Sequence, residues 1–308
     1  MTGDAALERQ TAPIPGSTPS PSSAPASDAR STERIAPAES VYDANARFDL
    51  LASLRELVAY REVIWAFGMR RLRTRYKQAV FGIGWAVMQP LAFLALFLVF
   101  LDRAIGDTGA TYAAGSYGAL VGWQFVSTAT TAGGSALVNE SSMLRKVFFP
   151  REAPVLGAVG AYLPDLAINT TLLLFLAPIL GGTLAWAWLV TPLLYLLLAL
   201  TAVAVALPLA ALAVYYRDFL YALPIGIQLL LFASPVAYPV DQLDARWHHL
   251  YAFLNPTVGP LDGMRRAYGD GEWPDWSLFG ASALSTTLVL ALGYRLLKAL
   301  DRRLADVV

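Results

Sequence analysis

The sequence contains no cysteine and only two histidines. Without cysteine the chain has no disulfide bridge, no thiolate metal site and no cysteine nucleophile. The histidines, His248 and His249, are adjacent, so they lack the i, i+4 spacing with which a helix presents two imidazoles to a zinc ion. These residue types therefore give no support to a metalloenzyme.

Two common catalytic motifs are also missing. The sequence has no G-x-x-x-x-G-K-[ST] loop, so it cannot cradle a nucleotide phosphate by that device, and it has no G-x-S-x-G nucleophile elbow. If this chain moves a substrate at the expense of ATP, another polypeptide must supply the hydrolysis.

Charge is scarce as well. Charged residues make up 15% of the chain and hydrophobic residues 56%, with a mean hydropathy of +0.49 and a formal net charge of zero. Residues 79–101 carry no charge at all, and about 20 such residues span the ~30 Å hydrocarbon core of a bilayer. The composition indicates an all-α integral membrane protein with one polytopic domain.

Composition divides the chain into three regions. Residues 1–45 are rich in Pro, Ala and Ser and have no apolar run for a core or a signal peptide, so we expect a disordered cytoplasmic tail. Residues 46–78 are expected to form cytoplasmic and interfacial helices, and residues 79–308 the transmembrane domain. The tail is either a docking or regulatory arm or a dispensable extension.

The segment Glu62–Lys77 predicts an amphipathic helix. At about 100° per residue its large apolar and aromatic residues share one face: Trp65, Met69, Leu72 and Tyr76. Three of its cations share the opposite face: Arg70, Arg73 and Lys77. Such a helix lies in the headgroup layer, with its cations toward lipid phosphates or an acidic partner. The uncharged run that follows argues against a surface helix of a soluble domain.

We predict six membrane spans: Ala79–Leu101, Tyr112–Val138, Ala153–Leu180, Leu189–Val214, Phe219–Val240 and Ser277–Leu297. The fifth is expected to be broken by Pro224, Pro235 and Pro239. The second span is rich in Ser, Thr and Gly, which let helices approach closely. Its Gly118-x-x-x-Gly122 pair favours packing within one subunit over a specific dimer seam.

The segment Asp241–Asp275 is too polar for a span and too long for a tight loop. Trp247–Phe253 and Val258–Ala267 are candidate short helices around Asn255-Pro256. They form either a re-entrant hairpin, which needs protein or a water-filled path to cover its irregular backbone, or an ordinary pair of helices in an extracellular loop.

Six spans place both termini on the same side, and the distribution of cations predicts which side. Placing the termini in the cytoplasm leaves only four of the 23 lysines and arginines outside: Arg103, Arg246, Arg265 and Arg266. The positive-inside rule therefore favours cytoplasmic termini.

Asp165 is the clearest ionisable residue within a predicted span, and such residues are costly in hydrocarbon. Asp165 either lines a polar conduit or is a buried carboxylate that accepts hydrogen bonds from hydroxyls or amides of a neighbouring span.

Several short segments occur in a distinctive order from about Ala46 to the C-terminus: Arg75-Tyr76-Lys77-Gln78, Gly82-Ile83-Gly84-Trp85, Gln89-Pro90, Leu144-Arg145-Lys146-Val147-Phe148-Phe149-Pro150-Arg151-Glu152, Tyr216-Arg217-Asp218, Ser234-Pro235 and Leu254-Asn255-Pro256. In this combination the chain resembles the ABC-2 permeases that export O-antigen, capsule and teichoic acid polymers. Two features depart from the pattern: the long N-terminal tail, and Pro260, which stands where an apolar helical residue is expected.

The resemblance implies a homodimer in the bacterial cytoplasmic membrane, joined to two copies of a separate ABC ATPase subunit. That partner would bind ATP and Mg, so this chain would be a transport subunit without a cofactor of its own, and not an enzyme. The substrate would be a lipid-linked polysaccharide or a polyol-phosphate polymer.

Three sets of residues receive candidate roles from this resemblance. The segment that would couple to the ATPase is a cytoplasmic turn with mixed apolar and charged residues: Arg145, Lys146, Val147, Phe148, Phe149, Arg151 and Glu152. The candidate gate is the amphipathic helix, where a guanidinium pairs well with phosphate: Trp65, Arg70, Arg73, Arg75, Tyr76 and Lys77. The pathway candidates are four aromatic residues and the intramembrane acid: Trp85, Phe93, Phe232, Tyr238 and Asp165.

Each role has a plainer alternative. The turn could be an interfacial loop held by lipid phosphates, and the aromatics could simply pack against neighbouring helices. Three other functions also stay open: an ABC-2 exporter of a different lipid or drug-like substrate, a polytopic glycan-transferring enzyme, and an ion-coupled transporter. The enzyme would need clustered acidic or metal-binding residues, and the ion-coupled transporter would more readily show an inverted repeat.

Overall fold

The computed structural model describes residues 55, 57–77, 84–105, 111–144 and 149–307. Within these ranges the regular structure is helical, and the described residues contain no strand. The predicted tail 1–45 lies outside the described residues, as do residues 78–83, at the start of the first predicted span, and residues 145–148 of the predicted coupling segment.

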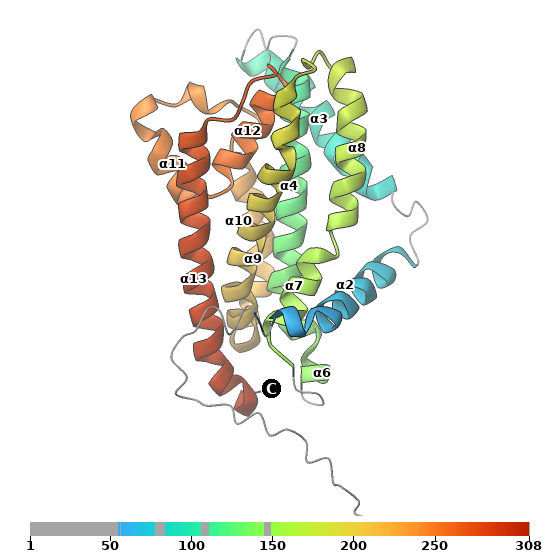
Figure 1. The fold of residues 1–308 in the computed structure, drawn as a ribbon, viewed down its shortest axis with the longest axis vertical. Helices are drawn as coiled ribbons and strands as arrows, with labels where there is room; N and C mark the ends of the chain where they lie inside the picture. Colours follow the sequence, from blue (N-terminus) through green and yellow to red (C-terminus); the bar gives the residue numbers. More distant parts are fainter. Residues whose placement is uncertain (1–54, 56, 78–83, 106–110, 145–148, 308) are drawn as a thin grey trace, which may run out of the picture. The chain divides into compact units, whose positions relative to one another are not determined.

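The described helices form a bundle (Figure 1). Its members are α3 (Gly84–Ile105), α4 (Tyr112–Gly134), the short α7 (Glu152–Gly160), α8 (Leu163–Ile179), α9 (Thr191–Tyr215), α10 (Asp218–Phe232) and α13 (Trp276–Val307). At one end lie α2 (Arg61–Tyr76), the short α5 (Ala136–Asn139) and α6 (Ser141–Leu144), and the last turns of α13. Toward the other end lie α11 (His248–Leu254) and α12 (Val258–Tyr268).

Among the described residues, three segments are long and apolar enough to cross a membrane. They are Glu152–Ile179, which comprises α7 and α8, Trp186–Tyr215, which comprises α9 and the 3-10 turn η1 (Trp186–Val190), and Trp276–Leu300, which is most of α13. These three correspond to the third, fourth and sixth predicted spans. Part of α3 (Val87–Leu96) and α10 are shorter apolar helices. The helices indicate a multi-pass membrane protein, whereas the full count of six spans stays a prediction.

The fifth predicted span is interrupted before Pro235, as its prolines indicate, whereas Pro224 lies inside α10. It was expected to reach Val240, but α10 ends at Phe232 after 15 residues. Pro235 explains the end, because proline has no N–H to donate and disfavours helical geometry in the residue before it. The chain resumes regular structure only in the 3-10 turns η2 (Val240–Gln242) and η3 (Ala245–Trp247).

A polar tie satisfies the backbone where α10 ends. The side-chain amide of Asn255 donates to the carbonyl of Ala233 at 2.8 Å and to the hydroxyl of Ser234 at 2.9 Å. Tyr251 also donates to the Ala233 carbonyl, at 3.0 Å, and the hydroxyl of Thr257 donates to the Asn255 side-chain oxygen at 2.7 Å. The Ser234-Pro235 and Asn255-Pro256 segments, distant in sequence, therefore meet and hold α10 against the α11–α12 connection.

Helix α4 occupies the centre, in contact with α3, α7, α8, α9, α10 and α12, and most of its residues are buried. Its glycines allow this close packing. A Cβ at Gly118 would lie 3.0 Å from the ring of Tyr268, and one at Gly122 would lie 2.7 Å from the sulfur of Met264. Both glycines therefore pack against α12 of the same chain, as the sequence predicted.

Every residue of α12 except Arg266 is buried, against α4, α9 and α13. Pro260 is its third residue, in the first turn, where backbone N–H groups have no partner within the helix and proline does no harm. The departure from the family pattern at Pro260 is thus compatible with a regular helix that starts at Val258. The re-entrant position of the hairpin in a bilayer stays a prediction.

Two glycines let α2 cross α7 at backbone distance. A Cβ at Gly157 would lie 2.7 Å from the Cβ of Phe67 and 2.8 Å from the carbonyl oxygen of Ile64, and one at Gly68 would lie 3.0 Å from the carbonyl oxygen of Gly157. Any side chain at this crossing would push α2 away from the bundle.

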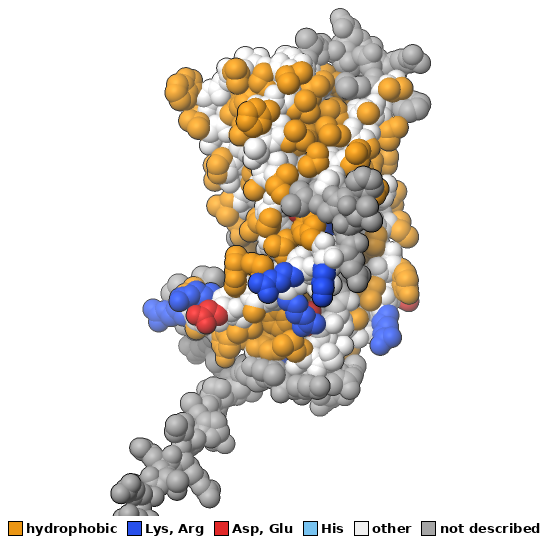
Figure 2. Space-filling model, turned by 90° about the vertical axis from the view of Figure 1, so that its right-hand side faces the viewer, with side chains coloured by type: hydrophobic (Ala, Val, Ile, Leu, Met, Phe, Trp, Pro, Cys, Tyr) orange, Lys and Arg blue, Asp and Glu red, His pale blue; other side chains and the backbone are white. Residues whose placement is uncertain are grey.

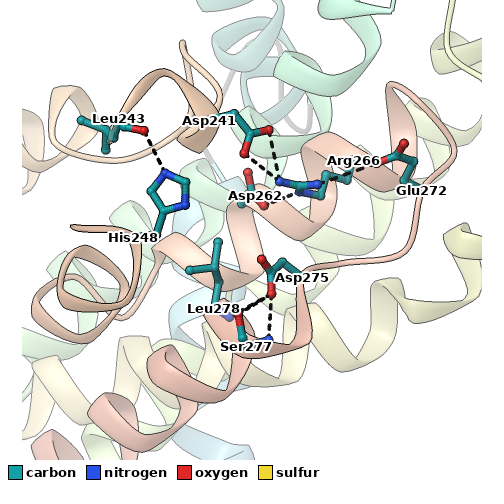
Figure 3. Close-up of polar contacts among 9 residues, drawn as sticks. All are labelled: Asp241, Leu243, His248, Asp262, Arg266, Glu272, Asp275, Ser277 and Leu278. Carbon is teal, nitrogen blue, oxygen red and sulfur yellow. Dashed lines mark hydrogen bonds and ion pairs between the residues drawn. The ribbon is translucent and has the colours of Figure 1, made fainter. Parts of the chain in front are cut away.

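A polar network lies around Arg266 of α12 and the start of α13 (Figure 3). Arg266 lies between three carboxylates, with Nε 2.7 Å from Asp262, Nη2 3.2 Å from Asp241 and Nη1 3.7 Å from Glu272. Asp275 caps α13, because its Oδ1 accepts hydrogen bonds from the amide and the hydroxyl of Ser277 at 2.8 and 2.6 Å.

The first prediction concerns the glycine crossing. Gly157→Ala should destabilise the protein by about 1–3 kcal/mol, because the added methyl meets backbone atoms that cannot move independently. The matched control is Gly160→Ala on the same helix, where an added Cβ has no atom within 4 Å. The control should be neutral or stabilising by about 0.5–1 kcal/mol. Thermal unfolding of both variants in detergent measures the difference, and equal midpoints would contradict the close crossing.

The second prediction concerns the cap at Asp275. Burial alone would raise the pKa of Asp275, but the hydrogen bonds from Ser277 and the nearby Arg266 outweigh it and hold the pKa below its ordinary value of 3.8. Because the folded-state pKa is lowered, the cap stabilises fully above that ordinary value and loses its effect as pH falls through the lowered pKa.

Asp275→Ala should therefore lower the free energy of unfolding by about 1 kcal/mol at pH 7. At pH 3 the difference in unfolding free energy between this variant and the parent protein should be smaller. Asp275→Asn is the control, since asparagine caps without titrating near these pH values. Unfolding midpoints at both pH values measure the effect, and an Ala gap that is equally large at pH 3 would argue against a titrating cap.

Candidate functional site

The basic helix α2 forms where the sequence predicts a helix, but its apolar residues do not gather on a single face, because the buried Phe67 lies opposite Trp65. Its residues are mostly good helix formers, Glu62 lies in the first turn, and Arg73 and Arg75 lie in the last turn, where each charge opposes the helix dipole favourably. Figure 2 shows basic side chains gathered in a band toward the α2 end of this face, below a surface that is mostly hydrophobic. This arrangement suits the boundary between hydrocarbon and headgroups.

Helix α2 contacts the bundle through two apolar sides. Phe67 is buried and packs against Phe149, with ring centroids 5.1 Å apart. Trp65, Met69 and Leu72 share a face, as predicted, and line an apolar groove of about 510 Å³ together with residues of α7 and α8. Trp65 remains largely exposed in this chain.

The cations of α2 have different environments. Nη1 of Arg70 lies 3.0 Å from Oε2 of Glu140, but the Arg70 side chain is 60% exposed, so the pair contributes little to stability. Arg73 is exposed, as is Lys77, which directly follows the helix. Arg75 is different, because it turns toward the bundle.

At the end of α2, two consecutive residues hold the carboxylate of Asp165 on α8. The guanidinium of Arg75 forms an ion pair with one carboxylate oxygen, and the hydroxyl of Tyr76 donates to the other. The Arg75 guanidinium also lies over the ring of Tyr162, 4.4 Å from its centroid, which fixes its plane. Of the two paired side chains, Arg75 is 33% exposed and Asp165 only 11%.

Tyr76 stays a hydrogen-bond donor over a wide pH range. Burial raises the pKa of Tyr76 to about 12, and its hydrogen bond to Asp165 acts in the same direction. The hydroxyl proton is therefore present at any physiological pH, and the carboxylate of Asp165 keeps both partners.

A polar cavity of about 80 Å³ lies beside this contact, between the end of α2 and helices α3, α4 and α8. Arg75, Tyr162 and Asp165 line one part of it, and Trp85 lines another. The remaining polar wall consists of amides and one hydroxyl: Gln89, Gln124, Thr128 and Asn169. By volume, the cavity can hold several water molecules or one small polar group.

One of the two sequence interpretations of Asp165 needs revision, that of a carboxylate satisfied by a neighbouring span, whereas the polar conduit stays a prediction. The partners of Asp165 come from α2, which lies beside the bundle, and not from hydroxyls or amides of a neighbouring span. Asn169, one turn farther along, donates to the backbone carbonyl of Asp165 at 2.9 Å. The sequence contained one signal for this pairing. A buried carboxylate is stabilised by a nearby cation, and Arg75 lies just before the first predicted span.

The pathway candidates do not form one surface in this chain. Trp85 is exposed at the edge of the cavity that Asp165 lines, and Phe93 is half-buried against the main core. Phe232 is exposed at the end of α10, and the hydroxyl of Tyr238 lies 3.1 Å from that of Tyr251. The structure thus brings Trp85 and Asp165 together, places Phe232 and Tyr238 beside the break after α10, and packs Phe93 against the main core.

The described part of the predicted coupling segment is anchored in the bundle. Phe149 is buried against Phe67, and Arg151 immediately precedes α7. Glu152, the first residue of α7, is buried, and its Oε1 lies 2.7 Å from Nζ of Lys298 on α13. Arg145, Lys146, Val147 and Phe148 lie outside the described residues.

The described residues contain no group of three or more His, Cys, Asp or Glu side chains placed to hold a metal ion. The chemistry of the site is therefore that of a guanidinium, a phenol, a carboxylate and amides around a small cavity, which suits the binding of a polar or anionic group.

Comparison with known proteins finds relatives over most of the chain. The chain is 25% identical over 240 residues to the O-antigen export system permease protein RfbA of Myxococcus xanthus, a match that covers 77% of this chain and 92% of the relative. It is 19% and 20% identical, over 239 and 240 residues, to two proteins of the same name from Klebsiella pneumoniae, again covering 77% of this chain and 91% of each relative.

A family profile gives the same result. The profile described as ABC-2 type transporter matches residues 62–268, which include α2, the Asp165 contact, α10 and the α11–α12 hairpin. This match spans more than half of the sequence, and the chain therefore belongs to the ABC-2 type transporter family.

Proposed function

We propose that this chain is the permease subunit of an ATP-driven exporter that moves a lipid-linked polysaccharide, of O-antigen or capsule type, across the cytoplasmic membrane. A polyol-phosphate polymer is the closest alternative cargo. The similarity to O-antigen export permeases carries the proposal, because it extends over 91–92% of each relative's length and is not confined to one motif. The chain itself would be a transport subunit and not an enzyme.

In the proposed membrane arrangement, six spans place both termini in the cytoplasm. The spans would be α3, α4, α7 with α8, α9, α10 and α13, and α2 would lie at the cytoplasmic surface. Helix α2 and the last turns of α13 lie at the same end of the bundle, which supports placing both termini on one side of the membrane. Exposed apolar residues on α11, including Leu250 and Leu254, support a hairpin that dips into the outer leaflet.

Two copies of this chain and two ABC ATPase subunits would form the transporter. The turn that ends at Glu152 is the proposed contact with the ATPase. Its last residues are held by α2 through Phe149 and by α13 through Lys298, so a displacement of the turn would reach both helices. Close backbone packing at Gly68 and Gly157 supports the same transmission, because interfaces of this kind shift as units.

The amphipathic helix α2 would be the gate at the cytoplasmic mouth. Its groove-facing residues suit the lipid part of a substrate and its cations suit a phosphate. The nearby Trp85 offers an aromatic face, which contacts a sugar ring without fixing one hydroxyl pattern. A lipid-linked glycan contains all three chemical groups.

The direct test is transport by the reconstituted complex. Proteoliposomes that contain this chain and its ATPase subunit should translocate a lipid-linked glycan when ATP and Mg are supplied. Liposomes with this chain alone, or with an ATPase that binds but does not hydrolyse ATP, should not. Full transport without the ATPase subunit would refute the proposal.

Charge reversal in the coupling turn provides a sharper prediction. Arg145→Glu combined with Lys146→Glu should strongly reduce both co-purification of the ATPase subunit and ATP-dependent transport, since an acidic turn would no longer complement the same surface. Arg246→Glu is the control, because Arg246 is an exposed cation near α11, toward the other end of the bundle. Undiminished transport by the double variant would remove the coupling role.

A further inference from the structure

The contact between α2 and Asp165 resembles, in its chemistry, the binding of an anionic ligand. A guanidinium and a phenolic hydroxyl address the two oxygens of one carboxylate, and a guanidinium holds the oxygens of a phosphate in the same way. The carboxylate belongs to the protein itself, on a helix that belongs to a candidate membrane span.

The guanidinium is prepared for this role. Stacking on Tyr162 fixes its plane, and a third of the Arg75 side chain remains exposed, so an incoming anion can approach it. The side chain of Asp165 is much less exposed than that of Arg75, and it faces the cavity.

The cavity beside the pair has the composition of a recognition site. Its amides and hydroxyl, from Gln89, Gln124, Thr128 and Asn169, are suited to the oxygens of a phosphate ester or of the first sugar, and Trp85 lies at its edge. The apolar groove of about 510 Å³ lies along the same helix, on the side of Trp65 and Leu72. A polar head and an apolar tail therefore both find suitable surfaces on α2.

We propose that Arg75 is a binding residue for the phosphate ester of a lipid, and that Asp165 occupies Arg75 in the resting state and is displaced by that phosphate. This inference rests on the proposed function, because it assigns the phosphate-bearing head of the lipid-linked substrate to one site. It adds a competition between an internal and an external anion for a single guanidinium. Release of Asp165 frees the end of α2 from α8, so that substrate binding itself opens the gate.

Competition and a purely structural ion pair predict different effects of substitutions at Arg75 and Asp165. If the ion pair were only structural, removing either partner would have the same effect on ligand binding. If the pair competes with the ligand, removal of Asp165 strengthens binding of the phosphate, whereas removal of Arg75 abolishes it. The opposite signs separate the two cases.

The experiment uses the purified full chain in an uncharged detergent, titrated with dodecyl phosphate and followed by calorimetry. Asp165→Asn should bind dodecyl phosphate roughly tenfold more tightly than the parent protein, as expected if Arg75 is free about a tenth of the time. Tyr76→Phe, which weakens the hold on the carboxylate but keeps the cation, should bind more tightly by a smaller factor. Arg75→Gln should lose binding.

Three controls complete the design. Arg71→Gln removes a cation of α2 that does not line the cavity and is not one of the candidate phosphate-binding cations Arg70, Arg73, Arg75 and Lys77, and it should bind as the parent does. Dodecyl glucoside, which has no charge, should not show the tightening. Inorganic phosphate is the third probe. If Asp165→Asn binds both inorganic phosphate and dodecyl phosphate more tightly, the site recognises the phosphate group alone. If it binds only dodecyl phosphate more tightly, the site recognises a lipid phosphate.

The proposal is overturned if Asp165→Asn and Arg75→Gln weaken binding alike, or if neither phosphate probe binds the parent protein or Asp165→Asn. Should Arg75→Gln fail to fold, the pair Asp165→Asn and Tyr76→Phe still decides, because weaker or equal binding by both would exclude competition. Transport is measured separately with the ATPase subunit. A complex that exports glycan without this exchange retains the proposed function and loses only the displacement of Asp165.

Discussion

Polar groups at membrane depth must find their partners inside the protein, and this requirement organises the structure. An unsatisfied backbone or carboxylate group in hydrocarbon costs several kcal/mol, because no water is there to replace the missing partner. The bundle meets the requirement at two places: Asp165 is held by two residues of α2, and the carbonyl of Ala233 after α10 is held by Asn255 and Tyr251. Each contact ties a helix to a segment distant in sequence, so the same bonds that satisfy polarity also fix the arrangement of helices.

Helix α7 joins several elements at the end of the bundle where α2 lies. Its first residue, Glu152, is paired with Lys298 of α13, its glycine at 157 admits the backbone of α2, and Phe149 just before it packs on Phe67. Three elements therefore meet within two turns of one short helix. In a close-packed assembly a force applied before α7 displaces its neighbours and is not absorbed by loose side chains.

Much of the fold follows from sequence pattern. The bounds of α2 and of the three long apolar segments, and the packing of Gly118 and Gly122 within one chain, agree with the predictions because helical periodicity, length and small residues act locally. The end of α10 before Pro235 was indicated by the sequence as well, whereas Pro224, which was also expected to break this span, lies inside α10. The pairing of Arg75 with Asp165 could not be predicted, since it depends on how α2 is folded back against α8, which no local pattern specifies.

The length of α10 has a consequence for the surrounding lipid. Fifteen residues rise about 22 Å, roughly 8 Å less than an average hydrocarbon core. Much of its surface is exposed in this chain, including Tyr221, Ile225 and Leu229. Where such a helix borders lipid, hydrophobic mismatch is relieved by local thinning of the bilayer, at a fraction of a kcal/mol per ångström. The protein would thus create its own shallow region of membrane beside α10, where a polar headgroup has the shortest distance to cross.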